Sequence, residues 1–225
     1  MFAARHRMAA ALTAVLLAGG CGDLDPAAAQ GIARNDVVSE LATQLSGSST
    51  RTFTAHYQLT GGARAAVSQA QHPPRTAYVY PGGRLLVSGG KVTVCGTRCT
   101  ATTAPRAGGP LPAASYADAE RAGLVAPATV IALLNTAALD ATATVTPRDT
   151  TIAGHHATCV GLSGTTGGFS TCVTNDGVLG SFTGTLDGRA VDMAMTDYTE
   201  RVTADVFATP GPQPTRQAAP VTRWP

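Results

Sequence analysis

Charged and aromatic side chains are scarce in this sequence. Only 13% of its 225 residues are charged and 5% are aromatic, and Lys91 is its single lysine. Arg5 and Arg7 lie in an N-terminal leader, and without these two the 16 basic residues become 14, which balance the 14 acidic ones. Proteins that bind nucleic acid need a basic surface, stacking rings or both. The composition therefore excludes nucleic acid as a partner.

Sequence patterns of catalysis are also missing. In residues 161–165, GLSGT, Thr165 stands where the hydrolase pattern Gly-x-Ser-x-Gly needs its last glycine. In residues 88–93, SGGKVT, Val92 stands where a phosphate loop needs Ser or Thr. Asp192 and Asp197 are an odd number of residues apart, so on a regular strand they face opposite ways. We predict that the protein is not an enzyme and uses no cofactor.

The histidine and cysteine patterns do not indicate a metal site. His155 and His156 are adjacent, so on a strand they point to opposite faces and cannot easily chelate one ion. A four-cysteine zinc site would need the spacing Cys-x3-Cys with Cys-x12-Cys, which does not match the usual short ligand spacing. We predict no metal.

Five cysteines are present, and four of them form an even set in an exported chain. The four are Cys95, Cys99, Cys159 and Cys172, which allow three disulfide connectivities. Each of the pairs Cys95–Cys99 and Cys159–Cys172 brackets an apparent turn. We therefore predict local pairing.

The first twenty residues have the three parts of a secretory signal peptide. A positive start is followed by a short apolar run over residues 8–17 and by small residues before Cys21. The run is too short to remain as a membrane-spanning helix. Residues 17–21, LAGGC, look like a bacterial lipobox, although Ala18 stands where leucine is commonest. A lipobox makes Cys21 the acylated, palmitate-bearing N-terminus of a lipoprotein. Such a lipoprotein lies on the extracytoplasmic face of the cell membrane. The alternative is an ordinary secreted protein in which Cys21 is an unused thiol.

The rest of the chain reads as one domain with an α+β order of elements. Residues 21–34 form a tether and residues 210–225, with five prolines, a disordered tail. Between them, in residues 35–209, the pattern predicts a helix that starts at Asn35, five strands joined by Gly-rich turns, two helices and about six strands. Residues 53–59 alternate cleanly, with Phe53, Ala55, Tyr57 and Leu59 on one face.

Residues 125–139 form the most unusual segment, because they contain no charged side chain. Pro127 suits the first turn of a helix, and apolar residues cover nearly the whole circumference. A helix of this kind must be buried or must contact something apolar besides its own sheet. It is either a core helix between the sheet and a neighbouring helix or a lid over a lipid-sized cavity.

The order of elements, with residues 204–212, ADVFATPGP, near its end, resembles the LolA-like superfamily of lipoprotein and lipid carriers. The resemblance implies a curved antiparallel half-barrel of about ten strands, with two to three helices packed on its concave face and acyl chains between them. It carries over no specific ligand residue, because the family's cavity is lined by interchangeable apolar side chains.

The function predicted on this basis is a membrane-anchored lipoprotein that binds or carries an apolar, lipid-like ligand. The alternative is a structural or sensory interaction module of the cell envelope with a filled core. Small residues (Ala55, Ala77, Ala132 and Ala137) would leave room for a ligand. The candidate cavity residues are Phe53, Tyr57, Tyr78 and Tyr80 on the sheet, and Val130, Ile131, Leu134 and Ala137 on the helix.

Overall fold

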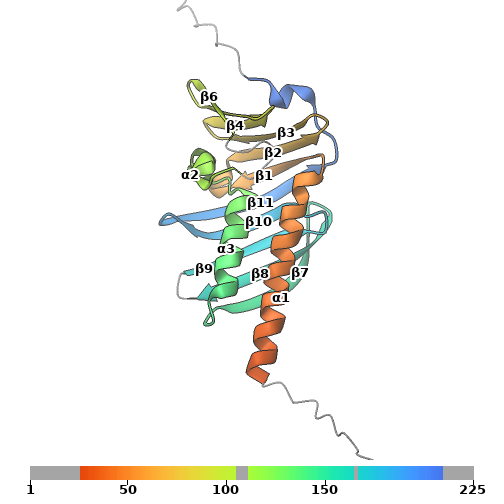
Figure 1. Cartoon of the computed structure of the whole chain (residues 1–225), viewed down its shortest axis with the longest axis vertical. Helices are drawn as coiled ribbons and strands as arrows, with labels where there is room; N and C mark the ends of the chain where they lie inside the picture. The colour runs from red at the N-terminus through yellow and green to blue at the C-terminus, as the bar shows by residue number, and fades with distance from the viewer. Residues whose placement is uncertain (1–25, 105–110, 165–166, 210–225) are drawn as a thin grey trace, which may run out of the picture.

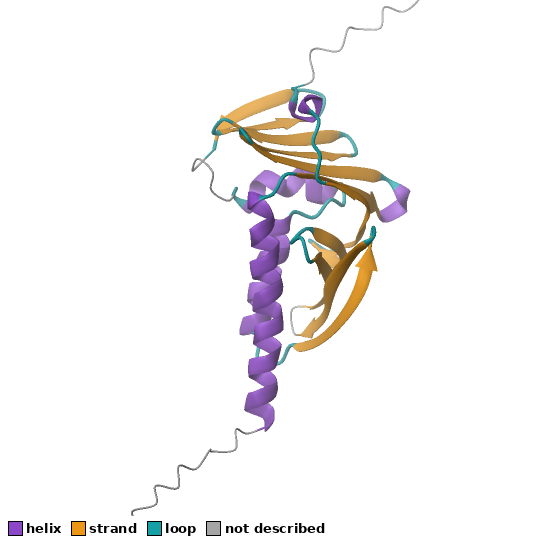
Figure 2. Ribbon diagram, turned by 90° about the vertical axis from the view of Figure 1, so that its right-hand side faces the viewer, coloured by secondary structure: helices purple, strands orange, loops and turns teal. Residues whose placement is uncertain are grey.

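A single antiparallel sheet of eleven strands runs through the whole structure, a computed structural model that describes residues 26–104, 111–164 and 167–209. The strand order is β6-β5-β4-β3-β2-β1-β11-β10-β9-β8-β7. The signal peptide, Cys21 and the Pro-rich tail lie outside the described residues. As the sequence predicts, the architecture is α+β with a curved sheet and three helices, the two long ones on its concave side (Figure 2).

The first half of the sheet is a meander of six strands. Tight turns with glycines at positive φ join successive strands, for example Gly82, Gly89 and Gly90. In β1 the predicted face is confirmed, because Phe53, Ala55, Tyr57 and Leu59 are all buried. The strands are β1 (Phe53–Leu59), β2 (Arg64–Gln71), β3 (Pro74–Tyr80), β4 (Gly83–Ser88), β5 (Lys91–Cys95) and β6 (Cys99–Thr103).

Five strands form the second half, which joins the first where β11 pairs with β1. Strand β7 continues without a break through Pro147. Proline is tolerated because β7 is an edge strand, and an edge strand can leave one side of its main chain unpaired. The strands are β7 (Thr144–Ile152), β8 (His155–Gly164), β9 (Gly167–Thr174), β10 (Leu179–Leu186) and β11 (Arg189–Thr199).

Two long helices, α1 (Pro26–Gly47) and α3 (Pro127–Leu139), pack against each other and lie along the sheet (Figure 1). Helix α1 begins at Pro26 and not at Asn35, so the prediction that Asn35 caps it is wrong. Proline is well placed in a first helical turn, and the alanines that follow it have high helix propensity. The third helix, α2 (Ala117–Arg121), is short.

The core lies between these helices and the concave face of the sheet. Helix α1 contributes Val38, Leu41 and Leu45, and α3 contributes Val130 and Leu134, each at most 1% exposed. Spacings of three and four residues place these side chains on one face of each helix. The segment over residues 125–139 is therefore largely a core helix.

The convex face of the first meander is covered by the end of the described chain, which includes the short helix η4 (Ala204–Phe207). The guanidinium of Arg75 lies 4.4 Å from the centre of the Phe207 ring, a cation–π contact, and Thr54 Oγ1 donates to the carbonyl oxygen of Arg201 at 2.9 Å. Ala77 lies beneath this cover and is fully buried. The prediction that it belongs to the concave wall is wrong, because it neighbours Tyr78 on a strand and so faces the other way.

Both disulfides join residues directly opposite each other on neighbouring strands. Cys95 on β5 is bonded to Cys99 on β6, and Cys159 on β8 is bonded to Cys172 on β9. The second pair is buried, whereas Cys99 is exposed at the edge of the sheet. Each bond therefore fastens one pair of strands.

Candidate functional site

A pocket of about 630 Å³ lies at the C-terminal end of α1, between that helix, the start of α3 and strands β2 to β4. We call it the α1–β3 pocket. Its apolar wall includes six large side chains, which come from both helices, the sheet and the segment before α2: Leu45, Tyr78, Val87, Leu111, Tyr116 and Ile131. Its volume is within the range of pockets that hold small ligands.

Tyr78 and Tyr116 form the aromatic part of this wall. Their rings meet edge to face with centroids 5.4 Å apart. Burial raises the pKa of the Tyr78 hydroxyl well above its usual value, and the neighbouring Tyr116 raises it further. Burial also raises the pKa of Tyr116. Both rings are therefore uncharged at neutral pH, and the wall stays apolar.

One rim of the α1–β3 pocket is polar and held by hydrogen bonds. The turn that follows α1, η1 (Ser48–Thr50), is fastened to β2 by two glutamine side chains. Gln69 Nε2 donates to the Arg51 carbonyl oxygen at 2.9 Å, and Gln71 Nε2 donates to the Ser49 carbonyl oxygen at 3.0 Å. Because these amides bind main chain, the rim has a fixed shape. It includes Ser46, Ser48 and Ser49, and the hydroxyls of Ser46 and Ser48 donate to the carbonyl oxygens of Ala42 and Leu45, each at 2.8 Å.

The charge of the pocket is low. Arg75 is the single charged residue among those that line it, and none of them is acidic. Within the part of the chain that the structure describes, no group of three or more His, Cys, Asp or Glu side chains is placed to hold a metal ion. The arrangement offers a ligand apolar contact and, at the rim, side-chain oxygens that can accept hydrogen bonds.

The structure divides the predicted cavity residues. Tyr78 and Ile131 line the α1–β3 pocket. Phe53, Tyr57, Tyr80, Val130 and Leu134 are buried in the protein's own core, and Ala137 is half-buried against it. Ala132, one of the small residues predicted to leave room for a ligand, is exposed on the outer side of α3.

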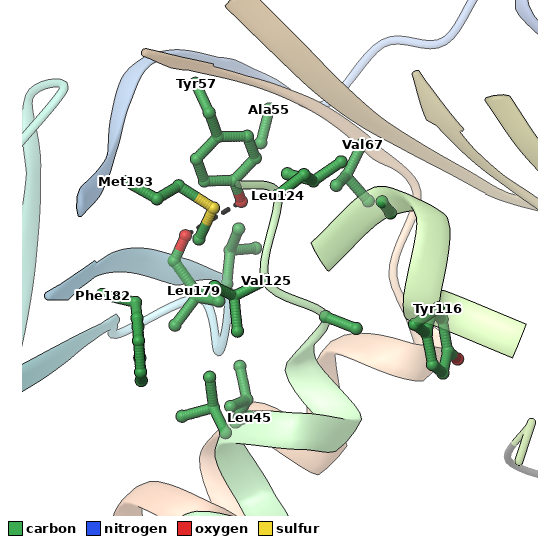
Figure 3. Packing of buried hydrophobic residues seen from close by; sticks show 14 of the residues in the cluster. Leu45, Ala55, Tyr57, Val67, Tyr116, Leu124, Val125, Leu179, Phe182 and Met193 are labelled. Carbon is green, nitrogen blue, oxygen red and sulfur yellow. Dashed lines mark hydrogen bonds between the residues drawn. The ribbon is translucent and has the colours of Figure 1, made fainter. Parts of the chain in front are cut away.

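Figure 3 shows buried side chains near Tyr57. Its ring lies beside Met193 and Leu124, and its hydroxyl donates to the Leu179 carbonyl oxygen at 2.9 Å. Val125 and Phe182 lie further from it, toward the helices, and all four of these apolar side chains are at most 1% exposed. These side chains come from the segment before α3 and from strands β10 and β11. The concave face near Tyr57 is therefore lined by buried side chains from distant segments.

Several lining residues are not predicted from the sequence. Leu45 follows the apolar stripe of α1, which predicts only a core position. Val87 lies on β4 at the position paired with Thr76, two residues from Tyr78, so strand alternation could have identified it. Tyr116 precedes α2 and gives no periodic signal, so only the fold brings it to Tyr78.

Comparison with known proteins finds neither a matching family model nor a matching curated protein. Similar solved structures include a chain of the MucA/MucB complex of Pseudomonas aeruginosa, with 9% identity and a TM-score of 0.47 over 79% of this chain. An uncharacterized conserved protein from Thermus thermophilus has 9% identity and a TM-score of 0.44 over 77% of this chain and 94% of its own. LprF from Mycobacterium bovis has 14% identity and a TM-score of 0.36 over 79% of this chain and 97% of its own.

The present chain spans 61% of the length of the MucA/MucB chain that it matches. The similarity to these neighbours is a likeness of fold alone.

Proposed function

We propose that this protein is a lipid-anchored extracytoplasmic protein that binds an apolar, lipid-like ligand in the α1–β3 pocket. The observation that carries the proposal is the pocket itself, about 630 Å³ in volume, with a wall of aromatic and aliphatic side chains and a rim of hydroxyl groups. A ligand with an acyl chain and a polar head would match both parts. Apolar burial against Tyr78, Tyr116 and Ile131 would provide most of its binding free energy.

The lipobox-like sequence before Cys21 is the basis for the anchor. Among the described residues, no helix combines the length and apolar character needed to cross a membrane. Helix α1 begins at Pro26, so only residues 22–25 separate it from the proposed anchor. The domain would therefore be held close to the membrane through α1.

Ala128 is the residue with which to test the pocket, because it is half-buried and lines the pocket from the first turns of α3. In the variant Ala128→Phe the added ring would occupy the ligand's space. We expect the amount of bound lipid to fall at least several-fold. Stability should change little, because an open pocket accommodates the added ring, whereas overpacking a tight core would cost about 1–3 kcal/mol of stability. Mass spectrometry of solvent extracts from the purified protein measures the lipid, and thermal unfolding measures stability.

Ala132→Phe is the matched control, since the same substitution on the same helix is exposed there. It should leave both the lipid content and the unfolding temperature unchanged. Absence of any lipid from the wild-type protein, or equal lipid in Ala128→Phe, would contradict the proposal.

The filled region around Tyr57 favours a second function, an interaction module of the cell envelope that has no internal ligand. Phe182 and Met193 are fully buried there. In this case Ala128→Phe would change neither extracted lipid nor localisation, and a surface patch would carry the function.

A further inference from the structure

Two serine hydroxyls at the rim of the α1–β3 pocket use their hydrogens on the main chain of α1. Ser46 Oγ donates to the Ala42 carbonyl oxygen at 2.8 Å. Ser48 Oγ donates to the Leu45 carbonyl oxygen at the same distance of 2.8 Å. A hydroxyl has one hydrogen to donate and lone pairs that accept. Toward a ligand, these two hydroxyls therefore act only as acceptors.

Two glutamine side chains at the same rim also use their donors on main chain. Gln69 Nε2 donates to the carbonyl oxygens of Ser48 and Arg51. Gln71 Nε2 donates to those of Ser49 and Arg51, at 3.0 and 2.7 Å. An amide has two N–H hydrogens and one oxygen, and only its nitrogen can face a carbonyl oxygen. Each glutamine therefore has its side-chain oxygen, an acceptor, left for a ligand.

No free cation faces a ligand from the described residues that line the pocket. Arg75 is the one charged residue among them. Arg75 and Tyr78 are three residues apart on β3, so their side chains project from opposite faces of the sheet. The Arg75 guanidinium lies on the convex side, 4.4 Å from the centre of the Phe207 ring. A charged ligand head would therefore enter the pocket without an opposite charge, which makes its burial unfavourable.

The two helix ends at the pocket also disfavour an anion. The C-terminal end of α1 carries a partial negative charge. Free N–H groups at the start of α3 would offset it, but Pro127 has no N–H. The N–H groups of Thr129 and Val130 both donate to the Ala126 carbonyl oxygen, at 3.0 and 3.2 Å. The start of α3 therefore provides few donors for an anionic head.

We propose that the α1–β3 pocket selects an apolar ligand whose head is uncharged and bears hydroxyl groups, as in a monoacylglycerol, and that Gln69 and Gln71 set this selectivity. The inference rests on the proposed function and specifies the head of that ligand. A hydroxyl head would donate to the glutamine oxygens and accept from Thr76, which lies on the same face of β3 as Tyr78. A carboxylate head, which only accepts, would meet acceptors at both glutamines.

Three lipids that differ in their heads test the selectivity: monooleoylglycerol, oleate and oleylamine. Displacement of the fluorophore N-phenyl-naphthylamine from the purified protein measures their relative dissociation constants. The buffer keeps both the carboxylate and the amine charged. We expect monooleoylglycerol to bind about tenfold or more tightly than either charged lipid, because only its head matches the rim without carrying an unpaired charge.

Gln71→Lys tests the role of the glutamines, because an ammonium group has three donors and no acceptor. The lysine can still donate to the Ser49 and Arg51 carbonyl oxygens, but it places a cation at the rim. Affinity for oleate relative to monooleoylglycerol should rise about tenfold. Gln58→Lys is the matched control, since it makes the same replacement at an exposed position of β1 and should leave this ratio unchanged. Gln69→Lys repeats the test at the rim if Gln71→Lys does not fold.

The outcomes separate this inference from the proposed function. If oleate or oleylamine binds the wild type as tightly as monooleoylglycerol does, the head-group selectivity is wrong and the lipid pocket stands. The same holds if the rim variants change the ratio no more than Gln58→Lys does. If none of the three lipids binds, the proposed function is wrong, and the selectivity is wrong with it.

Discussion

At the scale of single residues, the buried hydroxyl of Tyr57 has a hydrogen-bond partner in the core. Tyr57 is 3% exposed, and its hydroxyl donates to the main-chain carbonyl of Leu179, where β10 departs from regular pairing with β9. Burial raises the pKa of this hydroxyl well above its usual value, so the donor stays protonated. The bond ties β1 to β10 across the concave face.

Tyr57→Phe tests the contribution of this bond. The substitution removes the donor and leaves the Leu179 carbonyl in an apolar environment, so the free energy of unfolding should fall by about 1–3 kcal/mol. Urea denaturation followed by circular dichroism measures it. Tyr198→Phe is the control, because Tyr198 is only half-buried and its ring contacts with Phe53 and His155 remain. A stability of Tyr57→Phe equal to that of the control would mean that the hydroxyl is dispensable.

At the scale of elements, the two disulfides fasten strands in different environments. Cys159 and Cys172 are 0% and 1% exposed and form a small buried cluster with Ala157. The separation of these cysteines along the chain is 13 residues, against 4 for Cys95 and Cys99. A longer closed loop restricts the unfolded chain more.

Removal of the two disulfides should therefore lower the free energy of unfolding by different amounts. We expect the double variant Cys159→Ala/Cys172→Ala to lose about 3 kcal/mol of unfolding free energy from loop closure alone, and Cys95→Ala/Cys99→Ala about 2 kcal/mol or less. Chemical denaturation of both variants gives the comparison, and non-reducing peptide mapping of the wild type gives the pairing. A peptide with Cys95 linked to Cys159 would refute the local pairing.

At the scale of the whole molecule, α1 separates the proposed anchor from the pocket. The helix has 22 residues, and at about 1.5 Å per residue it is about 33 Å long. Its start follows the proposed lipidation site, and Leu45 near its end lines the α1–β3 pocket. The pocket and β6 thus lie toward the end of the molecule away from Pro26, where α1 begins.

Cys21→Ser should release the protein from membranes or block its maturation, since two acyl chains suffice for stable anchoring and the variant would have none. Membrane fractionation and mass spectrometry of the N-terminal peptide measure the outcome. The matched control, Cys95→Ser/Cys99→Ser, also replaces cysteine with serine but should stay in the membrane fraction. An unacylated N-terminal peptide in the wild type would show that Cys21 is an ordinary thiol.

The sequence by itself determined most of the helices, strands and turns, because each of these depends on a local pattern of residues. Alternation of apolar residues defined β1, glycines with positive φ marked the turns, and Pro127 marked the start of α3. Errors arose where local signals compete. Asn35 has the character of a helix cap, but Pro26 and the alanines after it begin the helix earlier, and Pro147 stays within a strand because that strand is at an edge.

Only the tertiary structure decided where space remains inside the molecule. Tyr57 and Tyr78 both lie on the concave face, and nothing local distinguishes them. Leu124 and Met193 lie buried beside Tyr57, whereas the end of α1 and the segment with Tyr116 leave a pocket beside Tyr78. A cavity is the volume that side chains from distant segments do not occupy, so it depends on how those segments pack and not on the residues of any one of them.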